Sequence, residues 1–165
     1  MSKKIKLLII GKHSFIGSNL YKYLRSKIFV KKFTFEEFIK LHQKYLNSFT
    51  YICNCSISKE YHNNIYKKKY DLDLQIINKI KNLNSKFIFL SSRKVYASKK
   101  NLTENSNTRP LTNYSKNKLI SESKIKEIIN NKYLILRISN LIGKKIYKKN
   151  NRKTSNTFID NYFKF

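Results

Sequence analysis

Residues 4–17 decide the fold: Lys4-Ile-Lys-Leu-Leu-Ile-Ile10 leads directly into Gly11-Lys-His-Ser-Phe-Ile-Gly17. The first segment has the length and apolar content of a buried strand, and the residues from Ser18 onward are typical of a helix. A strand that turns through glycines into a helix points backbone N–H groups and the positive helix end at a pyrophosphate. The stretch therefore predicts a dinucleotide-phosphate site formed by Gly11, Ser14, Phe15, Ile16 and Gly17.

The glycine loop departs from the usual pattern at its middle position. Only three glycines occur in the chain, and two of them stand at the first and last positions of a Gly-x-x-Gly-x-x-Gly loop. Ser14 holds the middle position, where a glycine would let the backbone approach the phosphates. We expect weaker binding or an altered geometry, and an ordinary strand-to-helix turn is the alternative that involves no ligand.

Strands and helices alternate along the chain. This alternation predicts an α/β fold of the Rossmann-like class, with a doubly wound parallel sheet of about five strands in a three-layer α/β/α arrangement. The expected strand order is 2-1-3-4-5, and ligands bind at the carboxyl ends of the first and third strands, where the glycine loop and Ser56 would meet. The predicted strands are 5–10, 28–34, 50–56, 86–91 and 133–138, and the predicted helices are 16–26, 35–46, 65–82 and 114–130.

Tyr114-Ser-Lys-Asn-Lys118 places a tyrosine and a lysine on one face of a predicted helix. An ammonium group one turn from a phenol favours the phenolate, and the pair can then act on a substrate hydroxyl. Chance matches to this spacing arise easily in a lysine-rich chain, so the position of the pair matters more than the spacing. The pair follows an apolar strand that ends at Ser92, a serine that elsewhere would only begin a turn.

These motifs together resemble the extended short-chain dehydrogenase/reductase superfamily, specifically its NAD-dependent epimerase/dehydratase family, which acts on nucleotide sugars. The similarity covers most of the chain, and its segments follow one another with family-like spacing. They are residues 11–17, 51–56, 87–96, 103–104, 110–119 with Glu122, and 136–143.

The resemblance implies a catalytic trio and a nicotinamide cofactor, NAD or NADP. Ser92 would orient the substrate hydroxyl, Tyr114 would act as the acid/base, and Lys118 would hold the phenolate and the nicotinamide ribose. Tyr114, Lys118 and Ser56 would also contact the cofactor. The expected partner is a nucleotide-sugar substrate.

Residues after the second predicted strand leave the choice of cofactor open. Lys31 and Lys32 favour the phosphate of NADP, whereas Glu36 or Glu37 would bind the ribose hydroxyls of NAD if the strand is longer. Both cofactors fit the sequence.

Arg93 and Lys94 follow Ser92, where the dehydratases of this family carry an acid pair. Elimination of water lacks its acid and base without those carboxylates, so epimerisation or simple reduction is favoured. Asp71 and Asp73 do not suggest a paired-carboxylate site either, since they cannot face the same way on a helix. The three histidines form no cluster, and no metal site is predicted.

Lysine and arginine outnumber the acids by 36 to 9, for a net charge of +27. So basic a chain ordinarily points to nucleic acid or an anionic surface. Residues with A/T-rich codons are enriched, however, while glycine and proline number only 3 and 1, so genomic base composition explains the charge. The lysines are dispersed and form no stripe with interleaved aromatics. We expect no specific binding of nucleic acid.

The apolar stretches are far shorter than the roughly 20 residues that span a bilayer. The apolar run that ends at Gly11 is also too short for the core of a signal peptide, so none is expected. We expect a cytoplasmic protein without membrane contact. Cys53 and Cys55 lie on one face of a predicted strand. They are expected to be buried, reduced thiols, because neighbours of this kind cannot form a disulfide without distortion.

Family members are considerably longer than 165 residues, and their C-terminal lobe grips the nucleotide sugar. Residues 1–145 are expected to form the NAD(P)-binding domain, and residues 146–165 to begin an incomplete substrate lobe or a tail. Three explanations stay open: a truncated product, a half-enzyme completed by a second chain, or a dinucleotide-binding or interaction module without turnover. A homo-oligomer or a completing chain is expected because apolar residues share a predicted helical face, namely Phe158, Ile159, Tyr162, Phe163 and Phe165.

Overall fold

The computed structural model describes residues 4–97 and 101–141. In this part of the chain, five parallel strands form one sheet in the order β2-β1-β3-β4-β5. The order and the parallel pairing confirm the predicted Rossmann-like class. The strands are β1 (Lys6–Ile10), β2 (Phe29–Phe33), β3 (Tyr51–Asn54), β4 (Lys86–Ser92) and β5 (Tyr133–Ile138).

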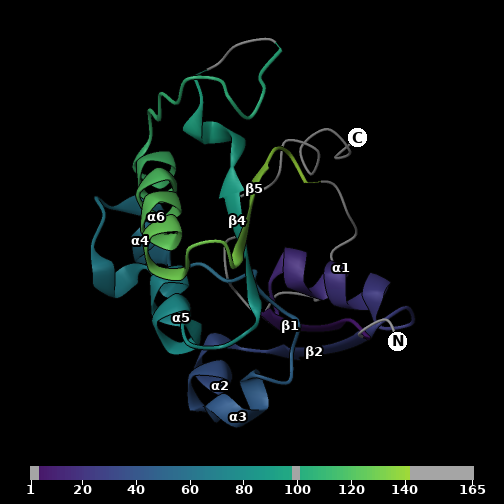
Figure 1. The fold of residues 1–165 in the computed structure, drawn as a ribbon. Coiled ribbons are helices and arrows are strands. Elements are labelled where there is room, and N and C mark those ends of the chain that lie inside the picture. Colours follow the sequence, from purple (N-terminus) through teal and green to yellow (C-terminus); the bar gives the residue numbers. More distant parts are fainter. Residues whose placement is uncertain (1–3, 98–100, 142–165) are drawn as a thin grey trace.

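Helices cover both faces of the sheet (Figure 1). The connections carry a short helix, α4 (Lys59–Asn63), and two 3-10 turns, η1 (Lys68–Tyr70) and η2 (Arg93–Val95). The result is the predicted three-layer α/β/α arrangement. One face carries α1 (Phe15–Leu24), and the other carries α2 (Phe35–Lys40), α3 (Gln43–Leu46), α5 (Leu72–Ile80) and α6 (Asn113–Ile129).

Alternate side chains of β1 build the two apolar cores. Leu8 and Ile10 pack into the core beneath α2, α3, α5 and α6. Leu7 and Ile9 point to the opposite face and pack against α1. Burial of an aliphatic side chain of this size contributes about 1.5–3 kcal/mol, so β1 stabilises both layers at once.

Three predicted elements are interrupted or markedly shortened, each near a polar side chain that bonds the backbone. The predicted helix 35–46 is interrupted at Leu41, whose backbone is extended, and His42 then caps α3 by accepting from the N–H of Lys44. The predicted helix 65–82 begins as α5 only after Asp71, which caps it. Strand β3 stops at Asn54, whose side chain accepts from the N–H of Ser56 at 2.9 Å.

The two cysteines are buried free thiols, as predicted. The Sγ atoms of Cys53 and Cys55 are 3.8 Å apart.

Within the described ranges, every helix is too short or too polar to span a bilayer. The predicted domain boundary at 145 and the apolar residues of 158–165 lie outside the described part of the chain.

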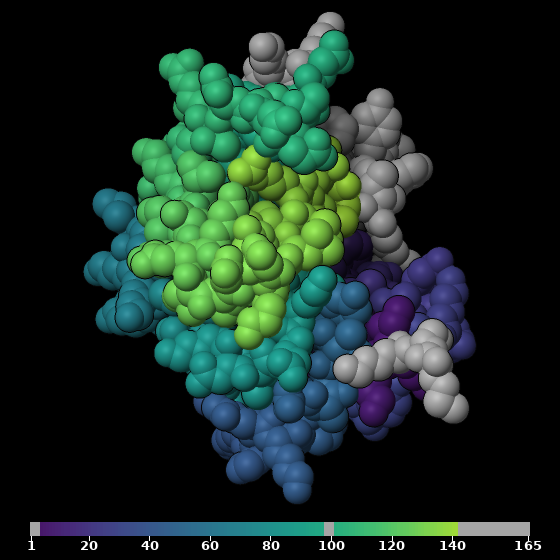
Figure 2. Space-filling model, in the orientation of Figure 1, coloured from purple at the N-terminus to yellow at the C-terminus, as the bar shows by residue number. Residues whose placement is uncertain are grey.

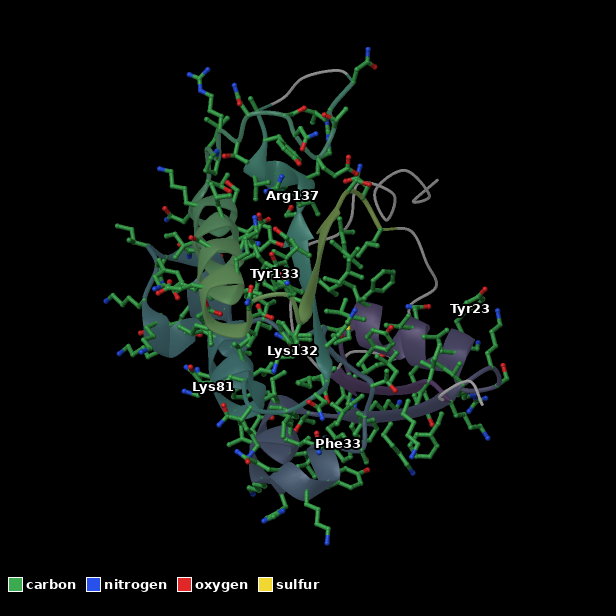
Figure 3. All side chains as sticks on the ribbon, in the orientation of Figure 1. Tyr23, Phe33, Lys81, Lys132, Tyr133 and Arg137 are labelled. Atoms are coloured by element: carbon green, nitrogen blue, oxygen red, sulfur yellow. The ribbon has the colours of Figure 1, made fainter. Side chains whose placement is uncertain are left out.

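An ion pair between half-buried Arg137 and buried Glu122 joins β5 to α6. Arg137 donates from Nε to Glu122 Oε1 at 3.0 Å and from Nη2 to Glu122 Oε2 at 2.6 Å. Glu122 is only 2% exposed and also accepts from the hydroxyl of Ser91 at 2.5 Å. Hydrogen bonding to Glu122 raises the pKa of Arg137, and Figure 3 shows this side chain on β5. The two-point contact fixes the last described strand against the longest helix.

Arg137→Met removes the guanidinium and leaves the carboxylate of Glu122 buried without its partner. We expect the free energy of unfolding to fall by about 1–3 kcal/mol, the scale for leaving a buried acceptor without its partner. Denaturant titration followed by circular dichroism measures the loss. Arg109 is exposed, so Arg109→Met is the matched control and should change stability by less than about 0.5 kcal/mol. Equal losses in both variants would contradict this structural role.

Candidate active site

Backbone segments meet at contact distance around the glycine loop. Gly11 has φ +100°, a backbone angle that favours glycine, and a Cβ there would lie 2.8 Å from the backbone nitrogen of Ser56. A Cβ at Gly17 would lie 2.4 Å from the carbonyl oxygen of Gly11. The loop and Ser56 therefore meet beyond β1 and β3, as the sequence predicts.

Ser14 begins α1 as its N-cap. Its Oγ accepts a hydrogen bond from the N–H of Gly17 at 3.0 Å, and its carbonyl oxygen accepts from the hydroxyl of Ser18 at 2.7 Å. Phe15 and Ile16 open the first turn, at the positive helix end where an anion is stabilised. The loop fits a pyrophosphate, but the serine already occupies one of the backbone donors.

Opposite charges meet beside the loop at the end of β2. Glu37 accepts from Lys12 Nζ at 2.9 Å and from the N–H of Thr34 at 2.7 Å, and these bonds lower the pKa of Glu37, that from Thr34 most. Lys31 and Lys32 lie inside β2 rather than beyond its end. Of the residues predicted to distinguish NAD from NADP, Glu37 contacts the loop through Lys12. This pairing favours neither cofactor.

A chain of hydrogen bonds joins Ser56 to Lys118. The hydroxyl of Ser56 donates to Asn54 Oδ1 at 2.6 Å, and Asn54 Nδ2 donates to Asp73 Oδ1 at 2.7 Å. Lys118 Nζ donates to Asp73 Oδ2 at 3.5 Å, and both residues are 4% exposed. Burial raises the pKa of Asp73 to about 6, and the charge of Lys118 opposes that rise. Sequence reasoning missed Asn54 and Asp73 as site residues. An asparagine in a buried strand needs a polar partner, so Asn54 was a signal both for itself and for a residue such as Asp73.

Asp71 is buried in the same polar cluster, and it lies outside the helix on which both acids were expected. Asp71 is the N-cap of α5 with an extended backbone, so the spacing of a helix does not apply to it. Its carboxylate accepts from the N–H of Leu74 and from the hydroxyls of Tyr66 and Ser121. Its negative charge adds to burial in raising the pKa of Tyr66. Two carboxylates therefore share one buried region, and each has its own partners.

Ser92 ends β4 and lines a cavity of about 280 Å³. Its Oγ accepts from the N–H of Lys94 at 3.2 Å, so it also performs the ordinary turn role of a strand-end serine. Thr112 and Ser115, at the start of α6, line the same cavity. Small-molecule pockets have volumes from about 300 Å³ upward, so this cavity is close to the smallest of them.

Tyr114 packs against α4. Its ring is half-buried, and the ring centroids of Tyr114 and His62 are 4.8 Å apart, with an angle of 30° between the ring planes. Among the described residues, the cavity lining includes Ser92 but not Tyr114. The structure thus brings Lys118 together with Asp73 and puts Ser92 in the cavity, while the joint action of Ser92, Tyr114 and Lys118 stays a prediction.

A larger hollow of about 1260 Å³ extends along β5. Figure 2 shows β5, in lime, at the molecular surface beside α6. Its described lining contains Glu122 and Arg137 but none of Ser92, Tyr114 and Lys118. We therefore assign the candidate chemistry to the smaller cavity and the polar cluster.

A parallel sheet of this order, with a glycine turn into α1, defines the Rossmann-like class, in which ligands bind at the carboxyl edge near the switch point. The chain belongs to the NAD dependent epimerase/dehydratase family, whose family model matches residues 7–164. A comparison with curated proteins finds no match.

Solved structures share the fold at low sequence identity. The dTDP-4-dehydrorhamnose reductase from Bacillus anthracis in complex with NADP is 20% identical, with a TM-score of 0.67 over 90% of this chain and 57% of that one. The UDP-glucuronic acid 4-epimerase from Bacillus cereus in complex with NAD is 18% identical, with a TM-score of 0.66 over 86% and 58%. The UDP-N-acetylglucosamine 4-epimerase from Methanobrevibacter ruminantium, in complex with UDP-N-acetylmuramic acid, is 22% identical, with a TM-score of 0.62 over 82% and 55%. The chain spans little more than half the length of each.

Gly17→Ala tests the close approach in the loop. The added methyl group would lie 2.4 Å from a backbone oxygen, which cannot move without shifting the β1–α1 turn. We expect the free energy of unfolding to fall by about 1–3 kcal/mol. Lys22→Ala, at an exposed position of the same helix, is the control and should leave stability unchanged within about 0.5 kcal/mol. A Gly17→Ala variant with wild-type stability in denaturant titration would refute the contact.

Proposed function

We propose that this chain carries the catalytic residues of an NAD(P)-dependent epimerase or reductase that acts on a nucleotide sugar. The observation that supports this best is the chain of hydrogen bonds from Ser56 to Lys118, because it links two expected cofactor contacts from β3 and α6. Membership of the family adds support, as do the NAD and NADP complexes among the structures that share the fold.

The residues present fit a nicotinamide dinucleotide, since the Gly11–Gly17 turn leads the backbone into the positive end of α1. That turn, Ser56 and Lys118 would hold the dinucleotide. When bound, its nicotinamide ring supplies a hydride acceptor or donor. Tyr114 takes the proton of the sugar hydroxyl on its phenolic oxygen and returns it in the reverse direction, while Ser92 orients that hydroxyl by a hydrogen bond. Lys118 keeps a positive charge on the same helix face as the phenol.

Charges at the cavity bear on the type of reaction. Arg93 and Lys94 line the cavity together with Ser92, and its described lining contains no carboxylate. Elimination of water needs a general acid and a general base beside the sugar. The lining therefore supports epimerisation or reduction rather than dehydration.

A second candidate is a dinucleotide-binding or interaction module without turnover. Two observations favour it: the hydroxyl of Ser14 already accepts the N–H of Gly17, and the ammonium of Lys118 is paired with Asp73. A module of this kind would bind a dinucleotide, if at all, without converting any nucleotide sugar.

Tyr114→Phe separates the two candidates. The substitution removes the proton acceptor and little else, so we expect turnover to fall at least about a hundredfold while dinucleotide affinity stays within a few-fold. Turnover is measured by nicotinamide absorbance and by chromatography of UDP- and dTDP-linked sugars. Tyr23→Phe is the control, because Tyr23 is 64% exposed on α1 and should not affect the reaction.

The outcomes are distinct. An active wild-type chain with an active Tyr114→Phe variant would mean that Tyr114 is not the acid/base. A wild-type chain that binds NAD or NADP without converting any sugar would favour the module. Turnover with tight dinucleotide binding would eliminate the module.

A further inference from the structure

We propose that His62 of α4 is a positioning residue for Tyr114. The two rings form a stack, and the imidazole closes the side of the phenol that leads away from the cavity. The phenol is thereby kept on the helix face that it shares with Lys118. The consequence for turnover rests on the proposed function, whereas the stack itself does not.

Two amide side chains of α6 fasten α4, one on each side of Tyr114. Asn113 Nδ2 donates to a backbone carbonyl oxygen of α4 at 3.1 Å. Asn117 Nδ2 donates to two further carbonyl oxygens, one in α4 at 2.7 Å and one in its C-cap residue at 2.8 Å. Figure 1 shows α4 and α6 side by side. The backbone that carries His62 is therefore fixed by the same helix that carries Tyr114.

The imidazole ring has a hydrogen bond of its own. His62 Nδ1 lies 2.8 Å from Asn63 Oδ1, and Nδ1 is the donor because an amide oxygen only accepts. The ring centroids of His62 and Tyr114 are 4.8 Å apart, within the spacing at which aromatic rings attract each other. His62 is exposed and Tyr114 is half-buried, so the imidazole covers part of the phenol.

Helix geometry places Tyr114 between α4 and the cavity. Successive residues of an α-helix are about 100° apart around its axis. Asn113 and Asn117, which bond α4, therefore lie about 60–100° from Tyr114 on one side. Ser115, which lines the cavity, lies about 100° from it on the other side. The phenol can turn either way, and His62 occupies the side that leads away from the cavity.

The strength of the stack suits a positioning task. An aromatic pair favours the stacked arrangement about twofold to tenfold beyond the area it buries. Proton transfer needs the phenolic oxygen within hydrogen-bond reach of the sugar hydroxyl, and a displacement of about 1 Å can slow a reaction about a hundredfold. A restraint of this size therefore changes the rate of the chemical step more than the stability of the fold.

His62→Ala removes the ring and leaves the backbone bonds between α4 and α6 in place. We expect kcat per folded chain to fall about tenfold, while KM for the nucleotide sugar and the affinity for the dinucleotide stay within about threefold. Turnover of UDP- and dTDP-linked sugars is measured by nicotinamide absorbance and chromatography. A merely structural residue would lower the folded fraction, measured by circular dichroism, without separating kcat from KM.

His62→Phe is the conservative variant, because it keeps a flat ring at the same place and lacks the ring nitrogens. We expect its kcat to stay within about threefold of the wild type. Lys59→Ala, at an exposed position of the same helix, is the matched control. It should leave both kcat and stability unchanged.

A double-mutant cycle tests the stack without cofactor or substrate. Denaturant titration of the wild type, His62→Ala, Tyr114→Ala and the double variant gives the coupling between the two side chains. We expect a coupling of about twofold to tenfold in the folding constant, the preference expected of an aromatic pair.

A loss of kcat in His62→Ala that His62→Phe restores supports the proposal. Wild-type kcat in His62→Ala, or an equal loss in the two variants, would overturn it. If the wild-type chain converts no nucleotide sugar, the proposed function fails, and the double-mutant cycle alone decides whether His62 holds Tyr114. A coupling indistinguishable from zero would then show that it does not.

Discussion

Close backbone approach at the glycine loop is the constraint on which the rest of the molecule depends. Gly11 and Gly17 bring β1, α1 and the segment after β3 to contact distance, with backbone atoms where side chains would otherwise stand. The start of α1 therefore faces the carboxyl edge of the sheet, and Ser56 lies beside it. Because β1 is buried on both faces, any shift of this turn disturbs both cores as well as the site.

Helix α6 carries two buried charges with different partners. Lys118 and Glu122 are four residues apart on its buried face, and each is paired with a residue of another element. Glu122 meets Arg137 through two hydrogen bonds, a geometry that stabilises the contact between α6 and β5. Lys118 meets Asp73 through one longer bond of 3.5 Å, beside a carboxyl whose raised pKa reflects its burial. The first pair joins α6 to β5, and the second joins α6 to α5.

The acids are more informative than the lysines in this basic chain. Base composition accounts for abundant, dispersed lysine, but it does not account for where the chain's few acids stand. Asp71, Asp73 and Glu122 are buried, and Glu37 is paired with Lys12 beside the loop. Where acids number only 9 against 36 basic residues, such placement indicates specific tasks.

The sequence by itself determined the alternation of strands and helices, the glycine turn and the shared helix face of Tyr114 and Lys118, because each follows from local periodicity and turn chemistry. The strand order and the three layers follow from the fold class that this alternation defines. Only the tertiary structure decided that Lys118 pairs with Asp73, that Asp71 caps α5 and that Glu37 turns to Lys12. These contacts join residues far apart in the chain or depend on where a helix begins. Spacing arguments fail there, because side-chain burial and capping select partners that no local pattern encodes.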